Sequence, residues 1–131
     1  MYYLYTFIPY CMELYLLIEK FGIGIDIVEV NRFSSKKFSD HEQFYRKIFT
    51  KNEIDYCTKF KNPYTHFAGK FALKEAVIKA LNKKIDLLDI ETFHQNDVPC
   101  VKLRNTTDYF SIASISHEKN IAVAVFLIDL S

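Results

Sequence analysis

Glycine and proline are scarce in this chain of 131 residues, which has three of each. Such low numbers exclude long flexible linkers and glycine-rich low-complexity segments. The glycines are Gly22, Gly24 and Gly69, and their spacing fits neither the GxxxxGK(S/T) nor the GxGxxG motif. The glycine-rich loops that bind nucleotide phosphates through these motifs are therefore excluded.

Cysteine is scarce as well. Cys11, Cys57 and Cys100 are odd in number and widely spaced. This pattern suits neither a disulfide framework nor a zinc site, and we expect a reducing, cytoplasmic environment. Hydrophobic residues make up 50% of the chain and charged residues 25%, which is typical of a globular protein and excludes disorder. The length predicts one domain with a single core.

The first 21 residues differ from the rest because they are aromatic, apolar and nearly uncharged. Pro9 and Glu13 interrupt the apolar run and no basic segment precedes it, which disfavours a signal peptide or a membrane span. We expect an N-terminal extension of unknown role over residues 1–21, either an added strand or helix or an upstream start before Met12. One domain then follows over residues 22–131.

Charge is unevenly distributed along the chain, although the net charge is only +1. Residues 36–84 carry twelve basic side chains against five acidic ones, whereas both flanking segments are net acidic. A basic middle third predicts an acidic partner, a phosphorylated ligand or a nucleic acid. A solvated helical surface rich in lysine is the alternative explanation.

Helices and strands are predicted in separate groups. The alternation of Ile23, Ile25 and Ile27 with smaller or polar residues predicts a strand over 22–28. Thr50 and Glu53 have the spacing of a capping box, which predicts a helix that begins at residue 51.

Further elements follow from periodicity and from turn residues. The last segment, IAVAVFLI, is apolar on both faces and is expected to be buried. The resulting class is α+β. Helices are expected at about 41–48 (capped by Ser39 or Asp40), 51–61 and 65–82, and strands at 87–94, 98–104, 109–116 and 121–129.

Three charged residues are candidates for chemistry. Glu75 and Lys79 are four residues apart on one stripe of the helix expected at 65–82. Ala68 and Ala72 share this stripe, and their small side chains predict a cleft above it. The alternative for Glu75 and Lys79 is an exposed ion pair worth about 0.3–0.5 kcal/mol.

Asp26 is an acid within an apolar strand. Such a residue needs a partner, a hydrogen-bonded site or a metal ion, unless it ends the strand and starts a turn. Asp26 and Glu75 are too few to enclose calcium, but two carboxylates with substrate oxygens suit Mg²⁺. A zinc hydrolase is not supported, because no histidine lies in an HExxH motif. A serine hydrolase is not supported either, because no serine lies in a GxSxG motif.

Three blocks stand out, in this order: GIGIDIVEVNR (22–32), FAGKFALKEAVIKA (67–80) and SISHEKNIAVAVFL (114–127). Together they resemble holo-[acyl-carrier-protein] synthase, the short type of 4′-phosphopantetheinyl transferase. The resemblance implies a small α+β domain with an antiparallel sheet and a long central helix. It also implies a homotrimer whose active sites lie between subunits.

The resemblance implies transfer of phosphopantetheine from coenzyme A to a serine of apo acyl carrier protein, with release of adenosine 3′,5′-bisphosphate. Asp26 and Glu75 would hold Mg²⁺ on the pyrophosphate, and Lys79 would neutralise or protonate the leaving group. Either Glu75 or a metal-bound water would take the proton of the serine. Contacts with coenzyme A would come from Lys70, Phe71, Lys79, Lys83 and His117.

One departure from the family lies after KEAVIKA, where a glycine-containing turn is usual. This chain has Leu81-Asn82-Lys83-Lys84-Ile85 instead. We expect the backbone to approach the phosphates less closely there, with Lys83 or Lys84 compensating by charge.

The basic middle third fits a carrier protein, because acyl carrier proteins are acidic helical bundles. Arg32 matches a basic position of the family, and charge and position add Lys36, Arg46 and Lys47 as steering residues. No nucleic acid or membrane partner is expected. Two alternatives are a transferase for a polyketide or peptide-synthetase carrier and a non-catalytic basic module that binds RNA or an acidic protein. The second is disfavoured, because Asp26 and Glu75 would have no purpose in such a surface.

Overall fold

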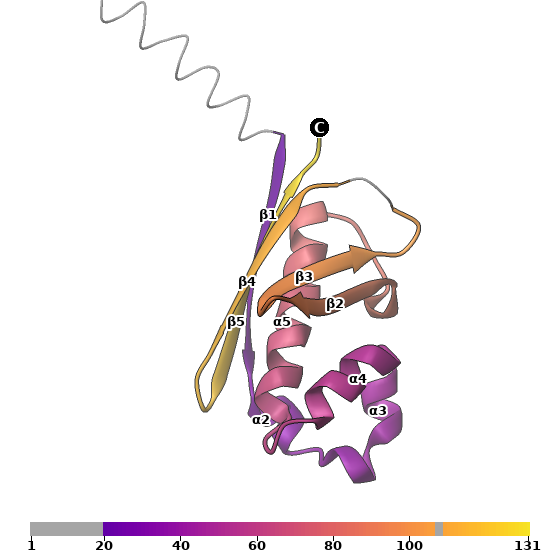
Figure 1. Ribbon diagram of the computed structural model, residues 1–131, viewed down its shortest axis with the longest axis vertical. Helices are drawn as coiled ribbons and strands as arrows, with labels where there is room; N and C mark the ends of the chain where they lie inside the picture. The colour runs from indigo at the N-terminus through magenta and orange to yellow at the C-terminus, as the bar shows by residue number, and fades with distance from the viewer. Residues whose placement is uncertain (1–19, 107–108) are drawn as a thin grey trace, which may run out of the picture.

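A three-stranded antiparallel sheet forms one face of the protein (Figure 1). The computed structural model describes residues 20–106 and 109–131, so the expected extension over 1–21 lies almost wholly outside the described residues. Within the described part, no helix is long and apolar enough to cross a membrane. The sheet has the order β1-β5-β4, from β1 (Phe21–Glu29), β5 (Ile121–Asp129) and β4 (Ser111–His117).

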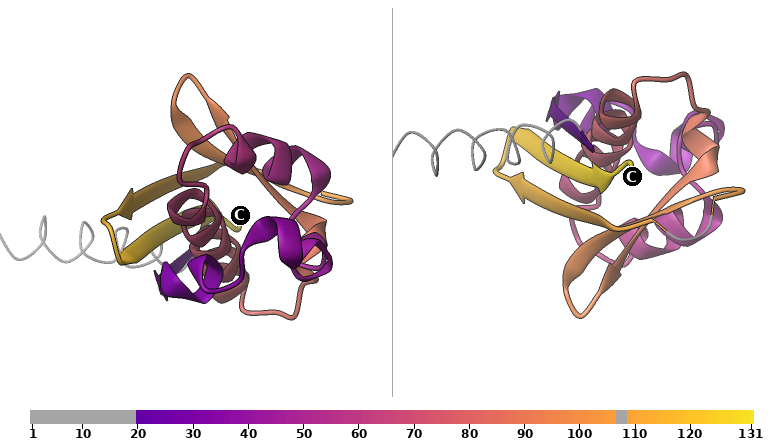
Figure 2. Two further views of the ribbon diagram at one scale, coloured as in Figure 1. Left: turned by 90° about the horizontal axis from the view of Figure 1, so that it is seen from below. Right: turned by 90° about the horizontal axis from the view of Figure 1, so that it is seen from above.

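The central helix α5 (Tyr64–Leu81) packs against the inner face of this sheet (Figure 2). Three short helices, α2 (Asn31–Ser34), α3 (Glu42–Arg46) and α4 (Lys51–Thr58), gather at one end of α5. A separate antiparallel pair, β2 (Ile90–Gln95) and β3 (Val98–Leu103), packs beside α5. The predicted α+β class, antiparallel sheet and long central helix are confirmed.

Two glycines of β1 allow α5 to come very close to the sheet. A Cβ atom added at Gly24 would lie 1.8 Å from the carbonyl oxygen of Ala76, and one added at Gly22 would lie 2.3 Å from that of Ala80. Real Cβ atoms do not approach backbone atoms so closely, so any other residue would push the helix away. The pair of glycines is therefore a packing device between strand and helix.

The outer face of the sheet is apolar and uncovered in the single chain. Ile23, Ile25 and Ile27 point away from α5 and are between 58% and 68% exposed, and Ile112 of β4 is 69% exposed. The prediction that β5 is buried on both faces is wrong for this chain alone. Its inner residues are buried, whereas Val123, Val125 and Leu127 on the outer face remain partly exposed because no layer covers them.

Most predicted elements occur within a few residues of their expected bounds, and the capping box of Thr50 and Glu53 is confirmed. The prediction that Ser39 or Asp40 caps α3 is wrong, because the N-cap is His41 and it makes no side-chain cap bond. Residues 87–89 form a 3₁₀ helix instead of the start of a strand, and a second 3₁₀ turn spans Phe38–Asp40. The short helix α2 was not predicted.

Gly24→Ala tests the close approach of β1 and α5. The added methyl group must separate the strand from the helix backbone, and we expect a loss of at least about 2 kcal/mol in the free energy of unfolding. Gly69→Ala is the matched control, because its Cβ would meet only a side-chain methyl group, Cγ2 of Ile115, at 3.0 Å and no backbone atom. Urea denaturation measures both. Equal midpoints for the two variants would contradict the packing role of Gly24.

Candidate active site

Asp26 and Lys79 meet where β1 crosses α5. The Nζ atom of Lys79 donates hydrogen bonds to Oδ1 of Asp26 and to the carbonyl oxygen of Ile25, both at 3.0 Å. The side chain of Asp26 is 17% exposed and that of Lys79 is 54% exposed. Asp26 thus has the partner that its position requires. It does not end the strand, because β1 continues to Glu29.

Glu75 lies one helical turn before Lys79 on the same flank of α5. Its side chain is partly exposed, and no residue of the described chain forms a hydrogen bond or ion pair with its carboxylate. The expectation of an open cleft above Ala68 and Ala72 is wrong, because both residues are completely buried. We call Asp26, Glu75 and Lys79 the carboxylate site.

The carboxylate site has a donor set that suits Mg²⁺. Within residues 20–106 and 109–131, no group of three or more His, Cys, Asp or Glu side chains is arranged to hold a metal ion. Magnesium, however, keeps several waters and is usually bound by one or two carboxylates together with substrate phosphates. The unpartnered carboxylate of Glu75 and the partly exposed carboxylate of Asp26 beside Lys79 fit that mode of binding.

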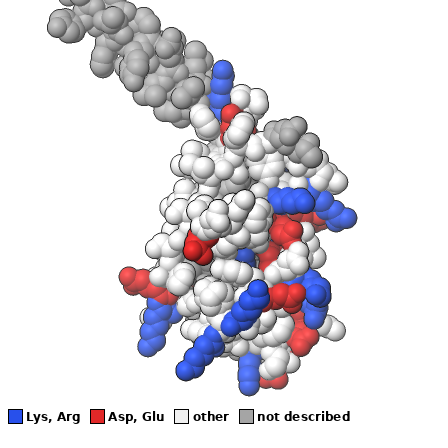
Figure 3. Space-filling model, in the orientation of Figure 1, with Lys and Arg blue, Asp and Glu red and all other residues white. Residues whose placement is uncertain are grey.

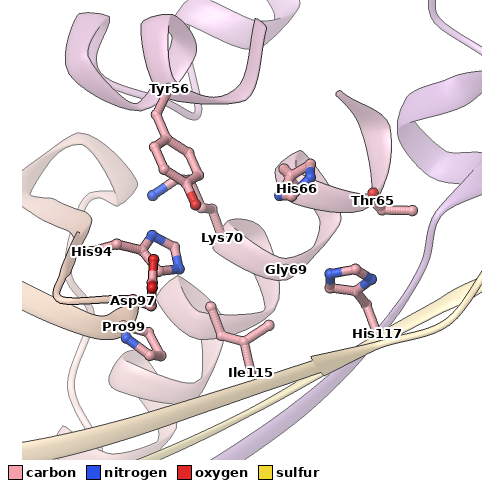
Figure 4. A pocket seen from close by; sticks show the side chains of 10 residues that line it. All are labelled: Tyr56, Thr65, His66, Gly69, Lys70, His94, Asp97, Pro99, Ile115 and His117. Carbon is pink, nitrogen blue, oxygen red and sulfur yellow. The ribbon is translucent and has the colours of Figure 1, made fainter. Parts of the chain in front are cut away.

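A second site is a cavity of about 240 Å³ on another flank of α5. Figure 4 shows its lining, with His66, His94 and His117 directed toward the cavity from α5, β2 and β4. The rings of His66 and His117 are 5.6 Å apart, and His94 stacks on Tyr56 at 4.8 Å. We call this cavity the histidine pocket; Tyr56, His66, Lys70, His94, Ile115 and His117 are among its lining residues.

Lys70 brings a buried positive charge to the histidine pocket. The residue is 1% exposed, and its Nζ atom donates to the carbonyl oxygen and to Oγ1 of Thr92 at 3.0 and 3.2 Å. It also lies 4.5 Å above the ring of Tyr56. Burial lowers the pKa of Lys70, and no carboxylate of the described chain forms an ion pair with it. An anion in the pocket would meet an ammonium group without a counter-charge.

Glu53 is linked to Lys70 through Thr92 in a buried hydrogen-bond network. One carboxylate oxygen of Glu53 accepts from Nζ of Lys74 at 2.6 Å and from the backbone N–H of Thr50 at 2.8 Å. The other accepts from the backbone N–H of Thr92 at 3.0 Å and from its hydroxyl group. Lys74 is fully buried and also donates to the carbonyl oxygen of Ile48 at 2.7 Å. The carboxylate thus caps α4, neutralises Lys74 and positions Thr92.

The two sites face opposite flanks of α5. His66 and Glu75 are nine positions apart, which is about two and a half turns of an α-helix. The β1 edge of the sheet approaches Ala76 on the side of the carboxylate site, whereas Ile115 of β4 contacts Gly69 on the side of the histidine pocket. The body of the helix therefore separates the two sites within one chain.

The residues expected to contact a carrier protein lie around α2 and α3. Arg32 and Lys36 pack on aromatic rings, 4.5 Å above Phe71 and 4.9 Å above Phe44. Arg46 forms an exposed ion pair with Glu42 at 3.4 Å, and Lys47 is exposed. Figure 3 shows Lys and Arg concentrated toward this end of the molecule, with Asp and Glu among them.

Phe71 and Lys83 are two of the residues expected to contact coenzyme A. Phe71 is 4% exposed, and the guanidinium group of Arg32 lies 4.5 Å above its ring, so a contact of Phe71 with coenzyme A stays a prediction. Lys83 is exposed just beyond the end of α5. The turn there does not need the missing glycine, because Asn82 adopts the left-handed conformation with φ of 50° and caps the helix.

Sequence reasoning missed His66, His94 and Tyr56. His66 and Lys70 are four residues apart, so helical spacing alone could have placed them on one face. His94 had no such signal, because its neighbours come from α4 and α5, far away in the sequence. His117 and Lys70, which the family motif singled out, are brought together in the same pocket.

Comparisons with known proteins agree with the motif blocks. Residues 22–126 match the model of the 4′-phosphopantetheinyl transferase superfamily. The holo-[acyl-carrier-protein] synthase of Thermodesulfovibrio yellowstonii is 44% identical over 110 residues, covering 82% of this chain and 96% of the relative. That of Halothermothrix orenii is 38% identical over 115 residues, covering 79% of this chain and 92% of the relative.

Solved structures show the same fold. The holo-(acyl-carrier-protein) synthase of Bacillus anthracis, in complex with CoA (3′,5′-ADP), superposes with a TM-score of 0.72 at 33% identity and covers 84% of this chain and 96% of that one. The synthase of Helicobacter pylori, in complex with coenzyme A, gives 0.70 at 32% identity and covers 82% and 99%.

Glu53→Gln tests the buried network below the histidine pocket. Glutamine can still accept the capping bond from Thr50, but Lys74 loses its counter-charge in the core. We expect the free energy of unfolding to fall by about 3–5 kcal/mol. Asp55→Asn is the matched control on the same helix, because it alters the exposed ion pair with Lys51 and should cost about 1 kcal/mol or less. Similar denaturation midpoints for both variants would refute the importance of the buried pair.

Proposed function

Because this chain belongs to the 4′-phosphopantetheinyl transferase superfamily and is of the holo-[acyl-carrier-protein] synthase type, we propose that it modifies acyl carrier protein. It transfers 4′-phosphopantetheine from coenzyme A to a serine hydroxyl group and releases adenosine 3′,5′-bisphosphate. The observation that carries this proposal is the carboxylate site, where Asp26 of the first motif block meets Lys79 of the second at 3.0 Å.

Each residue of the carboxylate site has a role in this reaction. Asp26 and Glu75 would hold Mg²⁺, which when bound neutralises charge on the pyrophosphate of coenzyme A. Lys79 is half exposed, and its ammonium group can turn from Asp26 to the leaving phosphate and neutralise or protonate it. Glu75 has no partner within the described chain, so its carboxylate is able to accept the proton of the attacking serine. Positioning and charge neutralisation supply most of the rate in such transfers.

Coenzyme A binds, in this proposal, between two subunits. Its pyrophosphate lies at the carboxylate site of one subunit, and another of its phosphates lies in the histidine pocket of the next, near Lys70 and His117. Two observations support this arrangement: α5 separates the two sites of one chain, and the apolar outer face of the sheet is left uncovered. A homotrimer closed by three equivalent head-to-tail contacts would complete three such sites.

The carrier protein docks, in this proposal, beside α2 and α3. Arg32 makes the main contact, held by its stacking on Phe71, and Lys36, Arg46 and Lys47 steer the acidic partner. Lys83 stands near the end of α5 and adds charge for coenzyme A. The mixture of acidic and basic side chains on this surface disfavours a nucleic acid. We place the protein in the cytoplasm, where the free thiols of Cys57 and Cys100 stay reduced.

Mass spectrometry of the carrier protein tests the function. The protein, coenzyme A, Mg²⁺ and apo acyl carrier protein are mixed, and the carrier should gain the mass of phosphopantetheine. Glu75→Gln should lower the rate at least about a hundredfold, because the metal loses a ligand and the serine loses a proton acceptor. Asp89→Asn, which alters an exposed ion pair with Arg104, is the control and should keep wild-type turnover. If no carrier tried gains the mass with well-folded protein, the transferase proposal fails.

Mixed assemblies test whether the sites lie between subunits. Glu75→Gln damages the carboxylate site and His117→Ala damages the histidine pocket, so each variant alone should be impaired. When two tagged copies are co-expressed and trimers that contain both are purified, about one third of the sites should combine an intact half from each copy. Activity should then exceed the sum of the two parent variants. Activity no higher than that sum would show that each site belongs to one chain.

A further inference from the structure

Three of the four histidines of this chain gather in the histidine pocket. Figure 4 shows that they come from three different elements and share one cavity with Lys70. His66 stacks on Phe60 at 3.6 Å and lies 5.6 Å from the ring of His117, while His94 stacks on Tyr56. Protonation of neighbouring rings in such a cluster is unfavourable in the free protein, because like charges repel in a partly buried space.

The pocket also holds polar groups that lack partners. Nδ1 of His94 is buried and has no hydrogen-bond partner within the described chain. Lys70 is a buried cation without an ion-pair partner there, and Asp97 at the rim is the one acid that lines the cavity. The other titratable or charged groups that line this pocket or the neighbouring cavity beside His94 are Asp55, Tyr56 and Lys59 of α4 and its end, Lys70 of α5, Glu91 and Asp97 of β2 and its turn, and His117 of β4.

The surroundings keep His66 and His94 neutral in the free protein near pH 7. Burial lowers the pKa of His66, and the charges of His117, His94 and Lys70 lower it further. Burial and Lys70 likewise lower the pKa of His94, against a smaller opposing effect of Asp97. A phosphate group in the pocket would reverse the balance, because an adjacent anion favours the charged form of histidine.

We propose that His66 and His94 are binding residues for a phosphate group of coenzyme A and that they take up protons when it binds. This inference rests on the proposed function, since coenzyme A is the ligand. In the free pocket, neutral His66 and His94 do not repel each other or Lys70, and in the loaded pocket their cationic rings make charge-assisted hydrogen bonds to the phosphate. Affinity for coenzyme A therefore rises as the pH falls from 7.5 to 6.5, above the range near pH 6 where a phosphate monoester itself gains a proton.

Titration calorimetry of wild-type protein with coenzyme A and saturating Mg²⁺ measures this coupling. The binding enthalpy is recorded in several buffers of different ionisation enthalpy, which gives the number of protons taken up. We expect net uptake of about one proton at pH 7 and a rise in Kd of about tenfold between pH 6.5 and 7.5. Zero uptake by the wild type would overturn the proposal.

Substitution assigns the protons to residues. His66→Gln/His94→Gln should reduce the change in Kd over this pH range to about twofold or less and should weaken binding mainly at pH 6.5. His41→Gln is the control, because His41 lies outside the pocket at the start of α3 and should leave the pH dependence unchanged. Unchanged proton uptake in the double variant would overturn the proposal.

NMR of the wild-type protein gives a second measurement that needs no variant. The ring resonances of His66 and His94 are titrated with and without coenzyme A, and their pKa values should rise on binding. Values that do not move would overturn the proposal. Dephospho-coenzyme A, which keeps the pyrophosphate but lacks the ribose phosphate, tests which phosphate is concerned. Loss of proton uptake assigns the pocket to the ribose phosphate, whereas retained uptake would contradict the placement of that phosphate in the histidine pocket.

The proposal and the proposed function fail in different ways. If coenzyme A binds at no pH, with the protein folded and Mg²⁺ present, the transferase function fails and the inference falls with it. If coenzyme A binds and is consumed, but without proton uptake through His66 and His94, the function stands and this inference alone is wrong.

Discussion

The contact between the glycines of β1 and the backbone of α5 determines the rest of the structure. Gly22 and Gly24 leave no room for a side chain between the strand and the carbonyl groups of Ala76 and Ala80. This fixes how far the helix lies from the sheet, and so lets Lys79 reach Asp26 and the carbonyl oxygen of Ile25. The spacing of these glycines fits no nucleotide-binding loop, but their lack of side chains allows the close packing that brings the residues of the carboxylate site together.

The opposite flank of α5 depends on electrostatic balance rather than on close packing. Burying Lys70 and Lys74 would be very costly without partners. Glu53 neutralises Lys74 and positions Thr92, which in turn binds Lys70. One counter-charge for two buried lysines leaves an excess of positive charge next to the histidines. The buried positive charge beside the cavity therefore attracts anions more strongly than an exposed lysine would, because solvent screens it less.

Sequence predicted the features that depend on neighbours along the chain. The strand around Asp26, the helix of Glu75 and Lys79, and the capping box of Thr50 all follow from local spacing. The histidine pocket could not be predicted from local spacing, because His66, His94 and His117 come from elements that only tertiary packing brings together. Burial of Phe71 under Arg32 and the left-handed Asn82 were missed for a related reason: side-chain stacking and a non-glycine turn leave no periodic signal.

The proposed assembly and the proposed catalysis have one physical cause in this chain. A helix that must cover the inner face of a small sheet has two flanks left for function, and these flanks point in different directions. In the proposed arrangement coenzyme A contacts both kinds of site, but one chain presents them on opposite flanks of α5. The outer face, with Ile23, Ile25 and Ile27, also lacks a cover within the chain. A neighbouring copy that covers apolar surface and supplies the second half of the site resolves both problems at once. For that reason, substitutions on the outer face should lower the transfer rate by weakening assembly, although they change no residue that contacts substrate.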